Sequence, residues 1–133
     1  MRDKNLSLVI VKDRKTLFQS NSSGIAGLIQ VIDLLGQDLQ GASAADKVVG
    51  RAAALLLAQF GASKVYAHTL SKEGLKVLRE NDIFIEYDGL VPKILDRTGK
   101  DICPFESFSL TIRSRDEAYE KLKSCLESFR VNG

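Results

Sequence analysis

The order of strand-like and helix-like patterns constrains the fold of this chain more than any other feature. Short β-branched segments predict strands at Lys64–His68 and Ile83–Tyr87. The segment between them, Ser71–Asp82, has the apolar spacing of an amphipathic helix, with Ser71 as its N-cap. Such alternation favours an α/β fold with a mixed sheet and helices on both faces.

The two ends of the chain carry clear local patterns. Alternating segments at Asn5–Lys12 and Thr16–Ser20, separated by a polar turn, predict an N-terminal hairpin. Helical apolar spacing follows over Gly24–Leu35. At the other end, Ser114 and Glu117 have the spacing of a capping box, which predicts a helix over about residues 114–130.

The middle of the chain contains its most apolar segment. We expect a linker at Gly36–Ala45 and a central helix over Asp46–Phe60, which ends at Gly61. Asp46 is placed to cap this helix. Small residues at four-residue steps, Gly50, Ala54 and Ala58, predict a face that packs closely against the rest of the fold.

Two cations near the start of this expected helix need an explanation. Lys47 and Arg51 are four residues apart, so they are neighbours on one helix face and repel each other by ~0.2–0.5 kcal/mol. The helix dipole also disfavours cations there. Both side chains lie in solvent or pair with acids of the fold, or they bind the phosphate or carboxylate of a ligand. In the second case Asp46, Lys47 and Arg51 form a ligand-binding site.

The segment CPFE at residues 103–106 is the second candidate for chemistry. Pro104 suits the first position of a helix, which makes Cys103 the N-cap and Glu106 the third helical residue. A thiol at a helix start has a lowered pKa and is a better nucleophile. The alternative is a small buried cysteine with Glu106 as an ordinary capping acid. Cys125 has the spacing of a core residue.

Metal chemistry has little support in the sequence. The single histidine, His68, and the two distant cysteines match no zinc-binding spacing. A zinc site of His68, Cys103 and Asp46 is conceivable, but we expect no metal and no cofactor.

Composition excludes several classes of protein. The net charge of +2, without a basic stripe, argues against nucleic acid as a partner. No apolar run reaches the length of a membrane span, so we expect no membrane association. The short apolar run near the N-terminus is a strand and not a signal peptide. Two cysteines far apart fit a reducing, cytoplasmic setting.

Three segments carry a resemblance to a known family. ADKVVGRAAALLL at residues 45–57, LVP at residues 90–92 and Cys103-Pro104 with Glu106 resemble a small bacterial family of unknown function, known mainly from structural genomics, with a cytidine-deaminase-like fold. The resemblance implies a single three-layer domain over residues 1–133. Because members of this superfamily commonly oligomerise, it also makes a homo-oligomer plausible.

The catalytic motifs of the deaminase superfamily do not carry over. Those enzymes hold zinc with an H-x-E or C-x-E motif on the helix after the hairpin, and with P-C-x-x-C where the next strand meets a helix. If the expected central helix takes the place of the helix that carries the first motif, residues 45–47 stand at that motif, and they read ADK. The strand Lys64–His68 then leads into TLSKEG, which has no cysteine.

Two functions remain open. The first is a zinc-free domain that binds a small anionic or nucleotide-like metabolite through Asp46, Lys47 and Arg51. The second is a metal-independent hydrolase or acyl transferase. In that case Cys103 is the nucleophile, and Asp46 or Glu106 is the acid/base. We favour the first, because one cysteine with a distant histidine is a weak catalytic pattern.

Overall fold

A computed structural model describes residues 6–22, 25–95 and 98–132, with side chains through Ser128. The strands are β1 Leu8–Lys12, β2 Lys15–Ser20, β3 Ser43–Val49, β4 Lys64–Ser71 and β5 Phe84–Val91. The helices are α1 Ala26–Leu35, α2 Arg51–Gln59, α3 Lys72–Glu80, α4 Pro104–Ser109 and α5 Ala118–Asn132, with short 3-10 turns at η2 Gly36–Leu39 and η3 Arg115–Glu117. Some positions in the expected elements lie outside this description, namely Asn5, Gly24 and the side chains of Phe129 and Arg130.

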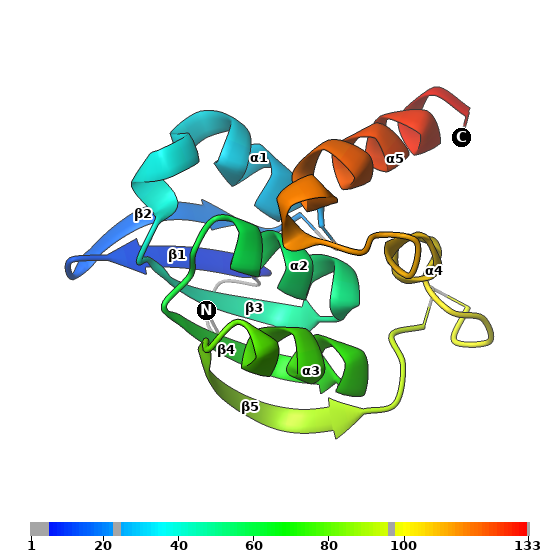
Figure 1. Cartoon of the computed structure of the whole chain (residues 1–133), viewed down its shortest axis with the longest axis horizontal. Helices are drawn as coiled ribbons and strands as arrows, with labels where there is room; N and C mark the ends of the chain where they lie inside the picture. The colour runs from blue at the N-terminus through cyan, green and yellow to red at the C-terminus, as the bar shows by residue number, and fades with distance from the viewer. Residues whose placement is uncertain (1–5, 23–24, 96–97, 133) are drawn as a thin grey trace.

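The five strands form one mixed sheet in the order β2-β1-β3-β4-β5, in which β1 is antiparallel to its two neighbours. The pairs β3–β4 and β4–β5 are parallel. The connections through α1, α2 and α3 all advance across the sheet in the same direction. Because such crossovers are right-handed, all three helices lie on the same face (Figure 1).

The α/β class and the mixed sheet are therefore confirmed. The helical layer that we expected on the second face is not formed by the residues that the structure describes. Burial alternates accordingly along the strands: Leu8, Ile10, Val65 and Ala67 are buried under the helices, whereas Lys64 and His68 point to the uncovered face and are exposed. We call this uncovered side of the sheet the open face.

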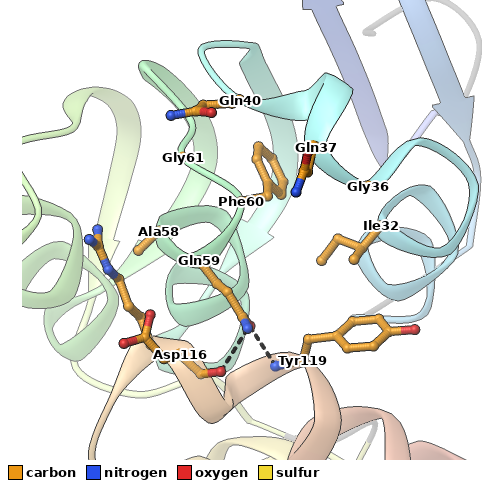
Figure 2. Close-up of a pocket in the computed structure, with 11 residues that line it drawn as sticks. Ile32, Gly36, Gln37, Gln40, Ala58, Gln59, Phe60, Gly61, Asp116 and Tyr119 are labelled. Atoms are coloured by element: carbon orange, nitrogen blue, oxygen red, sulfur yellow. Dashed lines mark hydrogen bonds between the residues drawn. The ribbon is translucent and has the colours of Figure 1, made fainter.

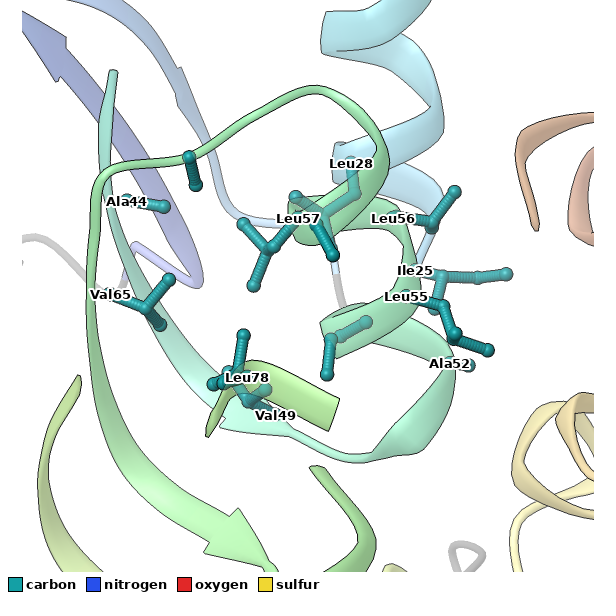
Figure 3. Close-up of a cluster of buried hydrophobic side chains, with 14 of the residues drawn as sticks. Ile25, Leu28, Ala44, Val49, Ala52, Leu55, Leu56, Leu57, Val65 and Leu78 are labelled. Atoms are coloured by element: carbon teal, nitrogen blue, oxygen red, sulfur yellow. The ribbon is translucent and has the colours of Figure 1, made fainter. Parts of the chain in front are cut away.

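Helix α2 lies at the centre of the core. Every residue from Ala52 to Ala58 is buried, because the sheet, α1, α3 and α5 surround the helix. Figure 3 shows Leu57 of α2 above Val65 of β4 and Leu78 of α3, with Ala44 and Val49 of β3 alongside. The prediction of a deeply buried central helix is thus confirmed for its second half.

The first half of that expected helix is a strand. Residues 43–49 pair with β1 on one side and with β4 on the other, so hydrogen bonds to both neighbours outweigh the helical propensity of the alanines. Gly50 is extended, with φ −103° and ψ −165°, and α2 begins after it. Asp46 is therefore not a helix cap, and the linker prediction for Gly36–Ala45 was wrong at its C-terminal end.

The other local predictions are confirmed with small shifts. The hairpin forms, and the Ser71 side chain accepts a hydrogen bond from the Gly74 N–H at 2.9 Å, as expected of an N-cap. Ser114 also acts as a cap, although its side chain accepts a hydrogen bond from the Asp116 N–H. The Glu117 carboxylate accepts one from the Arg113 N–H. No helix in the described ranges is long and apolar enough to cross a membrane.

Candidate functional site

Asp46 lies inside the protein, on the helical side of β3. It is paired in the sheet with Leu8 of β1 and Ala67 of β4, and it is 5% exposed. Burial raises the pKa of its carboxyl group to about 8, although the N–H groups of Val48 and Lys47 hydrogen-bond to it and oppose the shift. Asp46 is thus protonated at neutral pH.

The anion that the start of α2 requires comes from within the fold. Glu106 of α4 accepts hydrogen bonds from the Arg51 N–H at 2.6 Å and from the Ala52 N–H at 2.8 Å, one at each carboxylate oxygen. Burial raises the pKa of Glu106, and these hydrogen bonds together with the Arg51 charge oppose the rise. A Cβ atom on Gly50 would lie 1.8 Å from Glu106 Oε1, so only glycine leaves room for this carboxylate.

Arg51 completes a reciprocal arrangement between two helices. Its guanidinium donates to the carbonyl oxygen of Ser109, the last residue of α4, at 3.2 Å and to that of Ile112, three residues later, at 2.8 Å. Cations are favoured at helix C-termini. Glu106 thus caps α2 and Arg51 caps α4. The Arg51 side chain thus hydrogen-bonds to backbone carbonyl oxygens of the fold, partners that neither explanation from the sequence had named.

Lys47 and Arg51 are not neighbours on a helix. Lys47 is exposed and belongs to β3, where its direction is opposite to that of the buried Asp46. His68 is exposed within β4 and not at its end, and its ring lies 3.2 Å from the Thr69 hydroxyl. The structure therefore does not bring Asp46, Lys47 and Arg51 to one cavity.

Cys103 is the residue before α4, as predicted, with Pro104 in the first helical turn. Its thiol is half-buried and makes no capping hydrogen bond. Glu106 does not reach back to the Cys103 N–H, because that group already donates to the Ile94 carbonyl at 3.0 Å. Cys125 of α5 is also half-buried, and burial raises the pKa of its thiol, with a smaller contribution from Cys103.

In the structure, the two zinc motifs correspond to other residues than the sequence suggested. The helix after the hairpin is α1, preceded by NSSGI at residues 21–25, and the next strand, β3, leads into α2 through VGRA at residues 49–52. Neither segment contains histidine, cysteine or glutamate. No cluster of three His, Cys, Asp or Glu side chains that could hold a metal exists within the described ranges.

A hollow lies at the opposite end of α2 from Glu106. It has a volume of about 550 Å³ and lies between the C-terminal ends of α1 and α2 and the start of α5 (Figure 2). Its lining combines three side-chain amides with two aromatic rings and one cation. These residues are Gln37, Gln40, Gln59, Phe60, Tyr119 and Arg115.

Hydrogen bonds fix one wall of this pocket. Gln59 donates to the Asp116 carbonyl at 2.9 Å and accepts from the Tyr119 N–H at 2.6 Å, so its amide joins α2 to the start of α5. Arg115 donates to Asn81 at 2.9 Å. This site was not predicted from the sequence, because Gln37 and Gln40 belong to the segment that was expected to be a linker. Their occurrence together in GQDLQG was the one available signal.

Topology and geometry together define a cytidine-deaminase-like α/β domain, whose described residues contain no zinc-ligand cluster. A family model described as a domain of unknown function, DUF1893, matches residues 1–126, and the chain belongs to this family. The DUF1893 protein TM1506 from Thermotoga maritima is 31% identical, with a TM-score of 0.84 over 92% of this chain and 82% of that chain.

Enzymes of the deaminase class share the fold at lower similarity. A diaminohydroxyphosphoribosylaminopyrimidine deaminase/5-amino-6-(5-phosphoribosylamino)uracil reductase from Thermotoga maritima is 18% identical, with a TM-score of 0.52 over 82% of this chain and 35% of that chain. A dCMP deaminase from the cyanophage S-TIM5 is 15% identical, with a TM-score of 0.50 over 62% of this chain and 79% of that chain. Comparison with the curated proteins gives no match.

Proposed function

We propose that this protein is a zinc-free deaminase-like domain that binds a small nucleotide-like metabolite in the pocket between α1, α2 and α5. The observation that carries the proposal is the lining of that pocket. Its volume of about 550 Å³ falls in the range of small-molecule sites, roughly 300–1,000 Å³.

The side chains of this pocket suit a heterocyclic ring. A carboxamide both donates and accepts hydrogen bonds, so it matches the amide edge of a nucleobase. The side-chain amides of Gln37 and Gln40 make no hydrogen bond to the rest of the described chain, which leaves them available to a ligand. Phe60 offers an apolar surface for stacking (Figure 2).

The charge of the lining limits what the ligand carries. Arg115 is the one cation among the described lining residues, and the acidic Asp116 lies next to it. A single phosphate or carboxylate can pair with Arg115. Several phosphates would meet too little positive charge, so the proposal favours nucleobases, nucleosides and nucleoside monophosphates over triphosphates.

A ligand titration tests this proposal. Thermal melting and calorimetry against a panel of nucleobases, nucleosides and monophosphates should reveal a ligand that raises the melting temperature. Gln37→Ala and Gln40→Ala should each weaken its binding about 5-fold, the value of one hydrogen bond near 1 kcal/mol. The matched control is Gln19→Ala, an exposed glutamine on β2. A panel without any binder at millimolar concentration would refute the proposal.

The alternative enzyme has no comparable support. Cys103 does not line the described pocket, and both oxygens of Glu106 are held by α2. A nucleophilic role for Cys103 therefore stays a prediction from the sequence.

A further inference from the structure

Strand β5 forms a free edge of the sheet. None of its eight residues is buried, and in Figure 1 it is the lower border of the sheet, with no labelled element beyond it. The Phe84 N–H donates inward, to the Ser63 carbonyl at 3.2 Å. Because successive residues alternate in direction, every second residue after Phe84 points its N–H and C=O groups outward. These residues are Ile85, Tyr87, Gly89 and Val91. Among the residues that the structure describes, none hydrogen-bonds to this outer row.

This edge lacks most of the features that keep edge strands from pairing. Natural edge strands are commonly short, or they carry a bulge, a proline or a lysine. The opposite edge strand, β2, begins with Lys15, and its pairing with β1 contains a register shift between Ile10 and Val11. Strand β5 pairs with β4 in a constant register, and its sequence FIEYDGLV contains neither proline nor lysine. Its outer row of backbone groups is therefore able to pair with a further strand.

The two acids of β5 decide which strand fits. Glu86 and Asp88 are exposed on the open face, about 7 Å apart along the strand. Glu86 forms an exposed ion pair with Lys64 at 3.5 Å, and Asp88 accepts a hydrogen bond from the neutral Tyr66 hydroxyl. A carboxylate accepts several hydrogen bonds, so each acid can bind a further cation. An added strand that carries basic residues two positions apart matches this spacing.

We propose that β5 binds an extended segment of a partner protein, in which basic residues alternate with apolar ones. The basic side chains lie beside Glu86 and Asp88 on the open face, and the apolar ones lie beside Ile85 and Tyr87 on the helical side. Main-chain hydrogen bonds supply the affinity of such an added strand, and the side chains select its sequence. The site is separate from the pocket of the proposed function, because no residue of β5 lines that pocket.

A second copy of the chain fits this edge less well. In an antiparallel pair of β5 strands, related by a two-fold axis normal to the sheet, the centre of the pair falls on one residue. Centring on Glu86 or on Asp88 places that acid opposite the same acid of the copy. Centring on Tyr87 places Glu86 opposite Asp88. Like charges directly opposite each other destabilise a strand pair, whereas opposite charges stabilise it.

Fluorescence anisotropy with a labelled short peptide of alternating lysine and valine tests the proposal on the full chain. The peptide should bind, and its binding should weaken as the ionic strength rises, because the acids of β5 are exposed. The matched control peptide alternates glutamate and valine, and it should not bind at the same concentrations. The proposal is overturned if the lysine peptide does not bind at millimolar concentration, or if both peptides bind equally well.

Substitutions on β5 separate main-chain pairing from charge. Gly89→Pro removes an outer N–H, which edge strands tolerate, and should weaken peptide binding at least ~10-fold. A Cβ at this position lies 3.8 Å from its nearest neighbour, the His68 carbonyl oxygen, so the fold has room for it. Glu86→Gln and Asp88→Asn should each weaken binding about 2–5-fold, the range of an exposed ion pair. Asp38→Asn, at an exposed acid on η2, is the matched control and should bind as the wild type does.

Amide hydrogen exchange on the wild type requires no variant. The outward N–H groups of Ile85, Tyr87 and Gly89 should exchange fast in the free chain and slowly with the lysine peptide, whereas the inward Phe84 N–H should change little. A peptide that binds without protecting the outward groups overturns the proposal, as does equal binding to the wild type and all β5 variants. Sedimentation velocity gives the remaining outcome. A wild type that dimerises, and that Gly89→Pro makes monomeric, would identify a second copy as the occupant and would also overturn the proposal.

Discussion

Asp46 couples the stability of the protein to pH. Its pKa is about 8 in the folded chain, against an ordinary value of 3.8. Between these two values the folded state holds a proton that the unfolded state has released, so the free energy of unfolding falls as pH rises. The slope reaches about 1.4 kcal/mol per pH unit and vanishes below pH 4, where both states are protonated.

Asp46→Asn should therefore stabilise the protein, and more strongly at pH 8 than at pH 5. Asparagine keeps an oxygen for the Val48 N–H but carries no charge to desolvate. By this slope the gain should grow by a few kcal/mol between pH 5 and pH 8, and each kcal/mol corresponds to roughly 2–5 °C for a chain of this size, so melting curves over this range measure the effect.

The control for this change is Asp38→Asn, which alters an exposed acid on η2. It should leave the pH dependence of melting unaltered. Equal effects of the two substitutions at every pH would contradict a protonated Asp46.

Two side chains hold the helices α2 and α4 together: Glu106 of α4 caps the start of α2, and Arg51 of α2 caps the end of α4. Gly50→Ala should destabilise the protein by about 2–4 kcal/mol, because the added methyl group displaces Glu106 from two buried N–H groups. Gly50 has a negative φ, so backbone strain does not contribute. Urea unfolding of the variant measures the loss.

A double-mutant cycle separates this cause from ordinary crowding. In a Glu106→Ala background, Gly50→Ala should cost much less, since its main obstacle is gone and only Ile94 remains close, at 2.8 Å from the new Cβ. Additive losses would show that Gly50 and Glu106 act independently. Ala53→Gly in the same helix serves as a control for glycine and alanine exchange.

Local sequence patterns predicted most helices and strands. The strand at residues 43–49 was not predicted, because it depends on pairing with other strands. The hairpin, α3 with its Ser71 cap and the C-terminal helix follow from patterns within about ten residues. Residues 43–49 do not, because Ala44 and Ala45 become strand only through partners on β1 and β4. The sequence could show that Arg51 needed an anion, but not that Glu106, which is 55 residues away, supplies it.

The candidate pocket was beyond prediction for the same reason. Gln37, Phe60 and Tyr119 belong to three separate segments, which meet only because α1, α2 and α5 lie on one face of the sheet. Crossover handedness places the first two helices there once the strand order is known. The strand order itself could not be obtained from one sequence.

As a whole, the molecule has a cytidine-deaminase-like fold, and its described residues form no cluster of three His, Cys, Asp or Glu side chains that could hold a metal. Catalytic zinc takes three protein ligands, mostly His and Cys. This chain has one histidine and two cysteines: His68 lies on the open face, whereas Cys103 and Cys125 lie at α4 and in α5 on the helical side. These three side chains cannot surround one ion.

We therefore expect the purified protein to contain far less than one zinc per chain by elemental analysis. Extensive treatment with a chelator should leave its melting temperature unchanged, because the fold is held by the α2-centred core and the Glu106 and Arg51 caps. A bound structural zinc would contribute about 10 kcal/mol or more, so its removal could not pass unnoticed in a melting curve. Stoichiometric zinc that survives dialysis, with a melting temperature that falls on chelation, would mean that the metal is held by a geometry that the described residues do not form.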